Sequence, residues 1–201
     1  MARIETTTRT LFAFEELSDD AKQKALEALS DINVDYPDWH EFTLEDWKET
    51  LHTVGVDDAN INYSGFWSQG DGASFTGRVR LADWLKSQHL AGKYRTLYNR
   101  ARAHDIAAGI RRVSSHYSHE QTCTAWIEIG GYWSTDKAAD CERLERQANE
   151  CEELLEEWRR MQCHAIYKDL ENNYEYLTGE DAIRETILAN EYEFLEDGTL
   201  A

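Results

Sequence analysis

Few residues of this sequence have the type and spacing that catalysis or metal binding requires. His116 and His119, followed by Glu120 and Cys123, carry the side chains of a metal site. On a strand, however, residues three positions apart face opposite sides, so the two imidazoles would meet only across a turn. The segment 70–72, Gly-Asp-Gly, resembles part of a phosphate-binding loop, but it lacks the GxxxxGK[ST] pattern and precedes a strand. We therefore expect surface histidines and a hairpin turn, with no metal and no cofactor.

No serine or cysteine lies in a motif that would activate it as a nucleophile. The chain has no GxSxG elbow, and its 39 acidic residues are too numerous for any pair of carboxylates to stand out as an acid–base couple. The sequence therefore assigns no catalytic residue, and it favours a binding role over enzymatic catalysis.

A basic segment lies between two acidic ones, within a chain whose net charge is −18. Residues 78–112 carry nine basic and two acidic side chains. These basic residues either pair with acidic side chains of the flanking segments or form a site for phosphate or another anion. The candidates for an anionic-ligand site are Arg78, Arg80, Arg111 and Arg112. We expect no binding of duplex nucleic acid, because the acidic segments on either side would repel its phosphates.

A glycine-rich turn with aromatic neighbours lies in the middle of the chain. Residues 60–65 and 75–81 alternate between apolar and polar side chains, as half-buried strands do, and residues 68–72 supply the glycines of a hairpin connection. Large aromatic side chains that point outward mark binding surfaces. The sequence therefore predicts an antiparallel hairpin whose turn contacts a protein partner through Phe66, Trp67, Gln69 and Asp71.

A dense acidic band runs along the long helix expected near the C-terminus. Such a band is usually a solvated face, but it also fits a basic protein partner, including one whose nucleic-acid site it would occupy by mimicking a phosphate backbone. The candidate partner-binding residues of the band are Glu152, Glu153, Glu156 and Glu157.

The elements that must position these residues begin with a strand and two helices. Residues 7–14 are β-prone, and Ser18 is placed to cap a helix over residues 21–29. Residues 43–46 have the form of a capping box, and the helix that they open is expected to end at Gly55.

The remaining elements follow the hairpin. We expect helices over residues 81–89 and 93–104, strands over 110–116 and 122–129, one long helix over 135–174, a helix over 182–189 opened by a capping box at 178–181, and a strand over 192–194. The long helix carries an apolar stripe at intervals of three and four residues between Cys141 and Trp158, which predicts a packed face.

This order of elements contains hairpins but no regular alternation of strands and helices, which is typical of the α+β class. We expect a single α+β domain over residues 1–201, with an antiparallel β-sheet, packed helices and one long C-terminal helix. That helix either packs on the sheet, protrudes as an arm over residues 135–174, or pairs with a copy of itself in a homodimer.

The composition also predicts the compartment. No apolar run approaches the roughly 20 residues of a membrane span, and the start of the chain lacks the basic and apolar segments of a secretory signal. The four cysteines have no CxxC spacing, which favours reduced thiols. We therefore expect a cytoplasmic protein without a membrane partner.

Four segments of the chain resemble a known family. They are residues 14–22, 63–77 (YSGFWSQGDGASFTG), 174–182 and 190–194. They look like the small acidic proteins of bacteriophages and prophages that are often labelled "antitoxin of toxin–antitoxin stability system". The resemblance implies an accessory protein of a mobile element, acting in the cytoplasm of the host cell, with no catalytic residues to transfer. Phage accessory proteins of this size and charge also include inhibitors of bacterial immunity, such as anti-CRISPR proteins.

Two functions follow from these observations. The first is a phage or mobile-element protein that binds a bacterial protein, either a toxin or an immunity effector such as a CRISPR nuclease complex, and neutralises it by steric and electrostatic blockade. The alternative is a protein that binds, sequesters or hydrolyses a small anionic ligand or nucleotide and so acts against host defence. The two differ in whether the arginines of the basic segment converge on a cleft or pair with neighbouring carboxylates.

Overall fold

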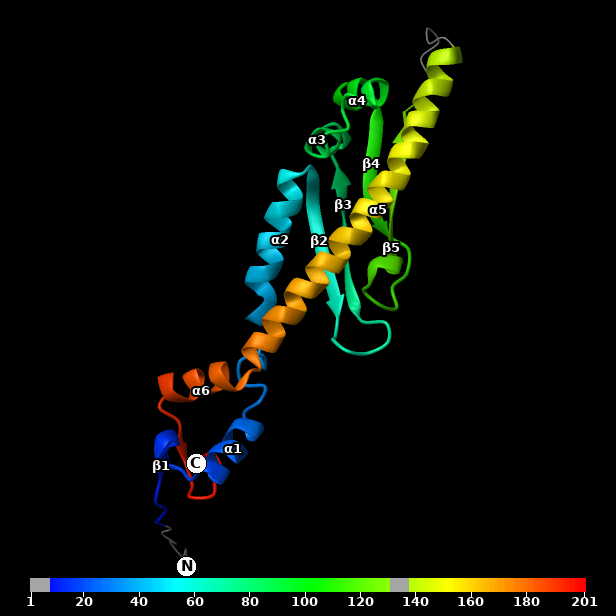
Figure 1. Cartoon of the computed structure of the whole chain (residues 1–201). Coiled ribbons are helices and arrows are strands. Elements are labelled where there is room, and N and C mark those ends of the chain that lie inside the picture. The colour runs from blue at the N-terminus through cyan, green and yellow to red at the C-terminus, as the bar shows by residue number, and fades with distance from the viewer. Residues whose placement is uncertain (1–7, 131–137) are drawn as a thin grey trace, which may run out of the picture. The chain divides into compact units, whose positions relative to one another are not determined.

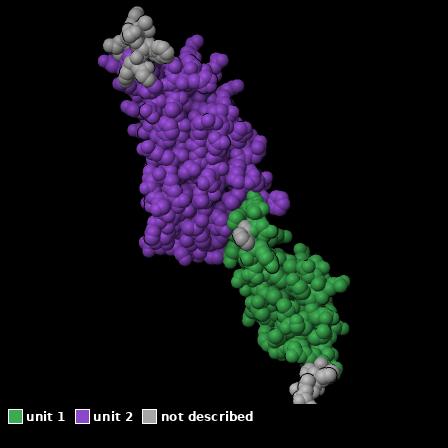
Figure 2. Space-filling model, turned by 180° about the vertical axis from the view of Figure 1, so that it is seen from behind, with its two compact units in different colours: residues 1–41, 172–201 green, residues 42–171 purple. Residues whose placement is uncertain are grey.

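The computed structural model describes residues 8–130 and 138–201, and it belongs to the α+β class (Figure 1). An antiparallel four-stranded sheet with packed helices and one long helix near the C-terminus confirm the predicted fold class. The chain divides into two compact units, Met1–Glu41 with Asn172–Ala201 (unit 1) and Phe42–Glu171 (unit 2), which Figure 2 colours separately. The single domain expected over residues 1–201 stays a prediction.

Unit 2 is built on a sheet of four strands in the order β2-β3-β4-β5, with every neighbouring pair antiparallel. The strands are β2 (Val56–Ser64), β3 (Gly72–Val79), β4 (Ile106–Arg112) and β5 (Cys123–Ile129). β2 and β3 form the predicted hairpin, in which Ile61 lies opposite Phe75. The strand predicted over residues 110–116 begins earlier, at Ile106, and ends at Arg112, where the chain turns into a loop.

Within the described residues of unit 2, three shorter α-helices precede the long one: α2 (Glu41–Thr53), α3 (Leu81–Ser87) and α4 (Arg95–Arg102). α2 starts before Thr43, so the predicted capping box does not open it. The helix ends before Gly55, as predicted, and Gly55 has a φ of 101°, a left-handed conformation that glycine adopts without strain. α3 and α4 are shorter than the helices predicted over residues 81–89 and 93–104.

The long helix α5 (Ala138–Leu177) lies across the sheet of unit 2 (Figure 1). Except for Cys141, which is half-buried, its predicted stripe is buried and consists of Leu144, Ala148, Cys151, Leu155 and Trp158. The Trp158 ring contacts Phe75 of β3 and Trp84 of α3 edge-on, with ring centroids 6.2 and 6.1 Å apart. Over this stretch the helix packs on its own sheet and is not a protruding arm. Its predicted start at residues 135–137 lies outside the described residues.

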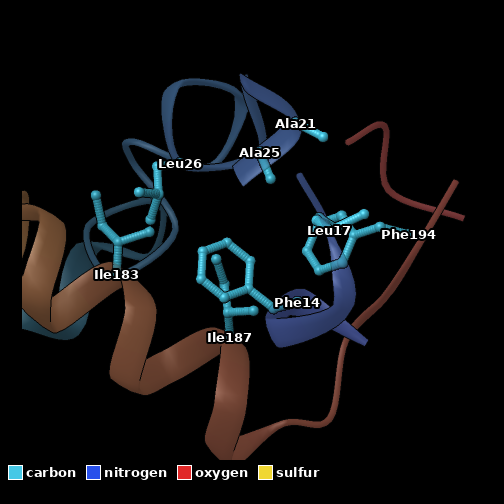
Figure 3. Close-up of a cluster of buried hydrophobic side chains, with 8 residues drawn as sticks. All are labelled: Phe14, Leu17, Ala21, Ala25, Leu26, Ile183, Ile187 and Phe194. Carbon is cyan, nitrogen blue, oxygen red and sulfur yellow. The ribbon is translucent and has the colours of Figure 1, made fainter. Parts of the chain in front are cut away.

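Unit 1 has a small core of its own (Figure 3). It lies between α1 (Asp19–Ala28), α6 (Glu180–Ala189) and an antiparallel pair of short strands, β1 (Phe12–Ala13) and β6 (Glu193–Phe194). The buried side chains of this core are Phe14, Leu17, Ala21, Ala25, Leu26, Ile183, Ile187 and Phe194. The strand predicted over residues 7–14 is thus reduced to β1, because the chain enters a 3-10 turn at Phe14.

The two helix starts predicted in unit 1 differ in outcome. Ser18 caps α1 as predicted, since its Oγ accepts a hydrogen bond from the backbone N–H of Ala21 at 3.3 Å. α6 begins without the predicted capping box. Its N-cap is Gly179, and the Thr178 hydroxyl instead donates to the carbonyl of Tyr174 at 2.8 Å.

Candidate functional site

A groove on unit 2 brings together three of the four arginines predicted to bind an anionic ligand. It has a volume of about 930 Å³ and is lined by the end of β3, the start of α3, the end of α4 and the adjoining part of β4. Arg78 comes from the end of β3, Arg80 precedes the start of α3, and Arg111 comes from β4. Side chains separated in the sequence by two helices therefore converge on one hollow.

The fourth predicted arginine, Arg112, does not line the groove. Successive side chains of a strand point to opposite faces, so Arg112 lies on the other side of the sheet from Arg111. Its guanidinium donates to the carbonyls of Ser114 at 2.7 Å and Tyr117 at 3.1 Å. Arg112 therefore holds the loop after β4 and does not join the other three predicted arginines in the groove.

Asp57 orients two of the groove arginines. Its carboxylate lies 3.5 Å from Nη2 of Arg78 and 3.3 Å from Nε of Arg80. Two further carboxylates are nearby: Asp83 lies 3.4 Å from Arg80, and Asp58 lies 3.7 Å from Arg78. Arg78 and Arg80 thus pair with aspartates and also line the groove.

Two other arginines give the groove its excess positive charge. Arg102 and Arg111 are exposed, and neither has an ion pair within residues 8–130 and 138–201. With Arg78 and Arg80 they make four arginines against two aspartates in the lining, a net charge of +2 when His104 is neutral. An anion that enters the groove therefore meets guanidinium groups whose charge is only partly compensated.

Sequence reasoning did not single out three residues of this lining. Arg102 and His104 stand inside the basic segment, and this position in the sequence was the signal that could have found them. Trp126 of β5 also lines the groove, but it follows no motif. Only the register of the sheet, which sets Trp126 opposite Gly109 of β4, places it there.

The residues of the predicted contact surface at the turn between β2 and β3 differ in their exposure to solvent. Phe66 is half-buried, because its ring stacks on Tyr63 with centroids 5.8 Å apart and contacts Tyr167 of α5 at 5.7 Å. Trp67 is 65% exposed. Trp67 is therefore the aromatic side chain that this turn presents to solvent.

Gln69 and Asp71 line a second hollow of about 600 Å³, beside Tyr117 and His119. The Oδ2 atom of Asp71 accepts a hydrogen bond from the backbone N–H of Ser68 at 2.7 Å, which closes the turn. Gln69 is exposed. Asp71 thus shapes the turn, while Gln69 extends the surface around Trp67.

Two glutamates of the acidic band are hydrogen-bonded to the sheet. Oε2 of Glu152 accepts from the backbone N–H of Ile127 at 2.7 Å, and Oε2 of Glu156 accepts from that of Ala125 at 2.8 Å. β5 is an edge strand, so these N–H groups have no neighbouring strand to pair with. α5 therefore closes this edge with two carboxylates.

The acidic band is consequently not a single face. Glu153 and Glu157 are exposed and available to a partner, whereas Glu152 and Glu156 are half-buried against β5. The predicted surface of four glutamates is thus reduced to two. A substitution of all four by lysine would disturb the fold, because two of them pair backbone groups of the sheet.

Glu156 also compensates a buried cation. Arg159 is 1% exposed; it lies 2.6 Å from Oε1 of Glu156, and it donates to the carbonyl of Glu120 at 2.6 Å and to Sγ of Cys123 at 3.1 Å. Burial by itself would raise the pKa of Glu156. Hydrogen bonds from Arg159 and from the N–H of Ala125 outweigh burial and hold that pKa at about 2.

Arg159 also contacts two buried thiols. The hydrogen bond from Cys163 lowers the pKa of Cys123 to about 6, and the charge of Arg159 acts in the same direction against burial. The same hydrogen bond, together with burial, raises the pKa of Cys163. This cluster of Arg159, Glu156 and the two thiols joins α5 to β5 in the core of unit 2.

The two histidines considered as metal ligands have other contacts. Nδ1 of His119 accepts a hydrogen bond from the N–H of Gln121 at 3.2 Å, and the His116 ring packs on Tyr117 with centroids 4.5 Å apart. In the residues that the structure describes, no group of three or more His, Cys, Asp or Glu side chains could hold a metal ion.

Comparison with known proteins places most of the chain in a family. Residues 39–180 match the model of a family described as a domain of unknown function, DUF8835. No curated protein and no solved structure matches the chain. The resemblance to phage and prophage proteins stays a prediction, because this description names neither a source nor an activity. Over the described ranges, no helix is both long enough and apolar enough to cross a membrane.

Proposed function

Because the chain belongs to the DUF8835 family, whose description assigns no activity, we propose a function from the geometry of unit 2: its groove binds a small anionic ligand. The observation that carries this proposal is the convergence of Arg78, Arg80, Arg102 and Arg111 on one hollow. This proposal describes a binding protein, since no catalytic group is assigned in the groove.

The chemistry of the lining supports an anion. Guanidinium groups present planar, two-pronged donors that match phosphate and carboxylate oxygens. Asp57 and Asp83 hold Arg78 and Arg80 in place, so less conformational freedom is lost when a ligand binds. The groove volume of about 930 Å³ falls in the range of roughly 300–1,000 Å³ that small-molecule sites occupy.

The charge of the whole chain limits the size of the ligand. The net charge is −18, so a long polyanion would be repelled outside the groove, whereas a small anion samples mainly the local charge of +2. We therefore expect a ligand with one to three anionic groups.

Thermal unfolding with a panel of anions tests this function. The probes are inorganic phosphate, pyrophosphate, nucleotides and cyclic dinucleotides, because a ligand that binds the folded state raises the melting temperature. Arg111→Ala is expected to weaken the binding of a stabilising anion by about tenfold, the effect of one charged hydrogen bond.

Arg146→Ala on α5 is the matched control, because it removes the same charge from an exposed site outside the groove. It is expected to leave binding unchanged. If no probe raises the melting temperature, or if both variants weaken binding equally, the groove is not the binding site.

A second candidate function is the neutralisation of a bacterial protein, a toxin or an immunity effector. It is supported by the 65% exposure of Trp67 at the turn and by the exposed pair Glu153 and Glu157 on α5. Such a surface would block a partner sterically and electrostatically. For either function we propose a cytoplasmic location, which the four free thiols support.

Capture from a bacterial lysate at two salt concentrations tests the second candidate. A toxin or nuclease retained at low salt and lost at high salt is expected for the wild type, because salt screens exposed charges. Trp67→Ala and the double substitution Glu153→Lys, Glu157→Lys should each reduce capture. Unchanged capture by both variants would exclude these surfaces as the docking site.

A further inference from the structure

An apolar strip continues from the groove arginines along β4. Arg111, Gly109 and Ala107 alternate with other residues of this strand, so they belong to one face of the sheet. Trp126 lies directly opposite Gly109 on β5 and belongs to the same face. A Cβ on Gly109 would lie 3.0 Å from Nε1 and Cζ2 of Trp126, so the indole occupies the space that a side chain there would fill. The face therefore carries a guanidinium, an indole and a methyl group in succession.

The strip is accessible from the groove. Ala107 is exposed and Trp126 is half-buried, and both line the groove. Ala82 of α3 and Ala101 of α4 are also half-buried and add two further methyl groups to its wall. Covering such apolar surface with a nonpolar group removes it from water, which is favourable. The groove can therefore bind more of a ligand than its charged group.

The arginines at the start of the strip fix where that charged group lies. Arg78 is directly opposite Gly109 on β3, and its Nη2 atom lies 3.5 Å from Oδ2 of Asp57. Arg111 is two residues from Gly109 on β4. Arg111 and Ala107 are four residues apart, about 13 Å along an extended strand, which leaves room for an anionic group that carries a chain of roughly six carbon atoms.

We propose that the ligand of the groove is an amphipathic anion, a phosphate or carboxylate joined to an alkyl or acyl chain. Its anionic group meets Arg111 and Arg78, and its chain covers the indole of Trp126 and the methyl groups of Ala107 and Ala101. This inference rests on the proposed anion-binding function and adds the class of ligand. It also gives Trp126, which no sequence motif marks, a role as a wall on which the chain packs.

Calorimetric titration of the full chain with phosphates of increasing chain length tests the inference. The probes are inorganic phosphate, methyl phosphate, butyl phosphate and hexyl phosphate, which retain one phosphate group while the apolar chain grows. A fully buried methylene contributes roughly fourfold in affinity, and a groove covers only part of the chain, so we expect about twofold for each methylene and about thirtyfold from methyl to hexyl phosphate.

Three alanine positions make the test specific. Ala101→Gln places a longer polar side chain in the wall, so it should remove most of the gain with chain length and leave the affinity for inorganic phosphate unchanged. Ala103→Gln is the matched control, because Ala103 is exposed at the end of α4 and does not line the groove. Ala107→Gln repeats the test at an exposed position of β4 and serves if the Ala101 variant does not fold.

The arginine variant separates the anionic group from the chain. Arg111→Ala should weaken the binding of all four phosphates to the same extent, because it removes a contact with the group that they share. A loss confined to hexyl phosphate would contradict the placement of the phosphate at Arg111.

The outcomes distinguish the two proposals. Equal affinity for methyl and hexyl phosphate, or the same chain-length gain in the wild type and in both glutamine variants of the wall, would refute the amphipathic ligand while the anion groove stands. A nucleotide that binds more tightly than hexyl phosphate would overturn it as well. Binding to phosphatidylglycerol vesicles that Ala101→Gln abolishes would assign the strip to a lipid surface and overturn the inference. If no probe binds, the groove itself fails as an anion site.

Discussion

At the scale of single residues, Glu156 has two structural roles. Its carboxylate pairs with a buried cation and also accepts a hydrogen bond from an edge strand. Its two oxygens pair with Arg159 at 2.6 Å and with the N–H of Ala125 at 2.8 Å. Removal of one partner of a buried ion pair leaves the other charge without compensation, which costs more than the pair itself contributes. The carboxylate of Glu156, which was predicted to bind a partner, therefore forms ionic and hydrogen-bonding contacts within the molecule.

We expect Glu156→Ala to lower the free energy of unfolding by about 3 kcal/mol, since Arg159 would stay buried without its carboxylate. Glu157→Ala, at an exposed position on the same helix, should change it by less than about 0.5 kcal/mol. Urea unfolding at pH 7 measures both. Equal effects of the two substitutions would mean that the ion pair contributes no stability.

The depressed pKa of Glu156 also sets the direction of a pH dependence. Its pKa is about 2 in the folded protein, below the ordinary value of 4.5, so its contribution to stability is complete above about pH 4.5 and is lost as the pH falls toward 2. The difference in unfolding free energy between wild type and Glu156→Gln should therefore shrink over this window. A difference that stays constant down to pH 2 would contradict the assignment.

At the scale of elements, α5 does two things for the sheet: it buries the apolar stripe on one face, and it closes the edge strand β5. An uncovered edge strand presents unpaired N–H and C=O groups to other chains. Glu152 and Glu156 are four residues apart, one helical turn, while Ile127 and Ala125 are two apart, one repeat of the strand. Because one helical turn and one strand repeat are similar in length, two glutamates of the same helix can each accept a hydrogen bond from an N–H group of the strand.

Amide hydrogen exchange followed by NMR tests this edge. Glu152→Ala should speed exchange of the Ile127 amide by roughly tenfold, because it removes a hydrogen bond to a charged acceptor. The Ala125 amide, held by Glu156, should keep its rate. Glu153→Ala, on the exposed side of the helix, is the control. An unchanged Ile127 amide in the Glu152 variant would show that this hydrogen bond does not protect the edge.

At the scale of the whole molecule, the chain forms two compact units with separate cores. The core of unit 1 joins the two ends of the chain, since Phe14 and Phe194 are in contact with ring centroids 6.0 Å apart (Figure 3). Phe194 is fully buried there. The candidate sites for ligand and partner all lie in unit 2.

Phe194→Ala is expected to destabilise unit 1 by about 3–5 kcal/mol, the usual effect of truncating a buried aromatic side chain. Hydrogen exchange with mass spectrometry should show loss of protection in α1 and α6, with protection of β2 to β5 retained. Leu188→Ala, at a position that is 44% exposed on α6, should leave both unchanged. Equal loss of protection in all elements would mean that the two units unfold together.

Several features could be predicted because they depend on residues close in the chain. The hairpin of β2 and β3 follows from alternation around a glycine-rich turn, and the buried stripe of α5 follows from its spacing. The Ser18 cap is equally local. Capping boxes at 43–46 and 178–181 were predicted by the same reasoning and were wrong, because the helices begin at neighbouring residues with a different hydrogen-bond pattern.

The fold class, the basic segment and the residue types available for binding could all be inferred from the sequence. Which of these residues meet depends on how distant segments pack. Arg111 and Arg112 are adjacent in the chain and carry the same charge, yet the pleat of β4 sends one to the groove and the other to a loop. The register of β4 and β5 places Trp126 opposite Gly109. The packing of α5 against β5 leads two of the four predicted glutamates to pair with N–H groups of this edge strand. These outcomes depend on pairings between distant segments, whose energies no local pattern of residues contains.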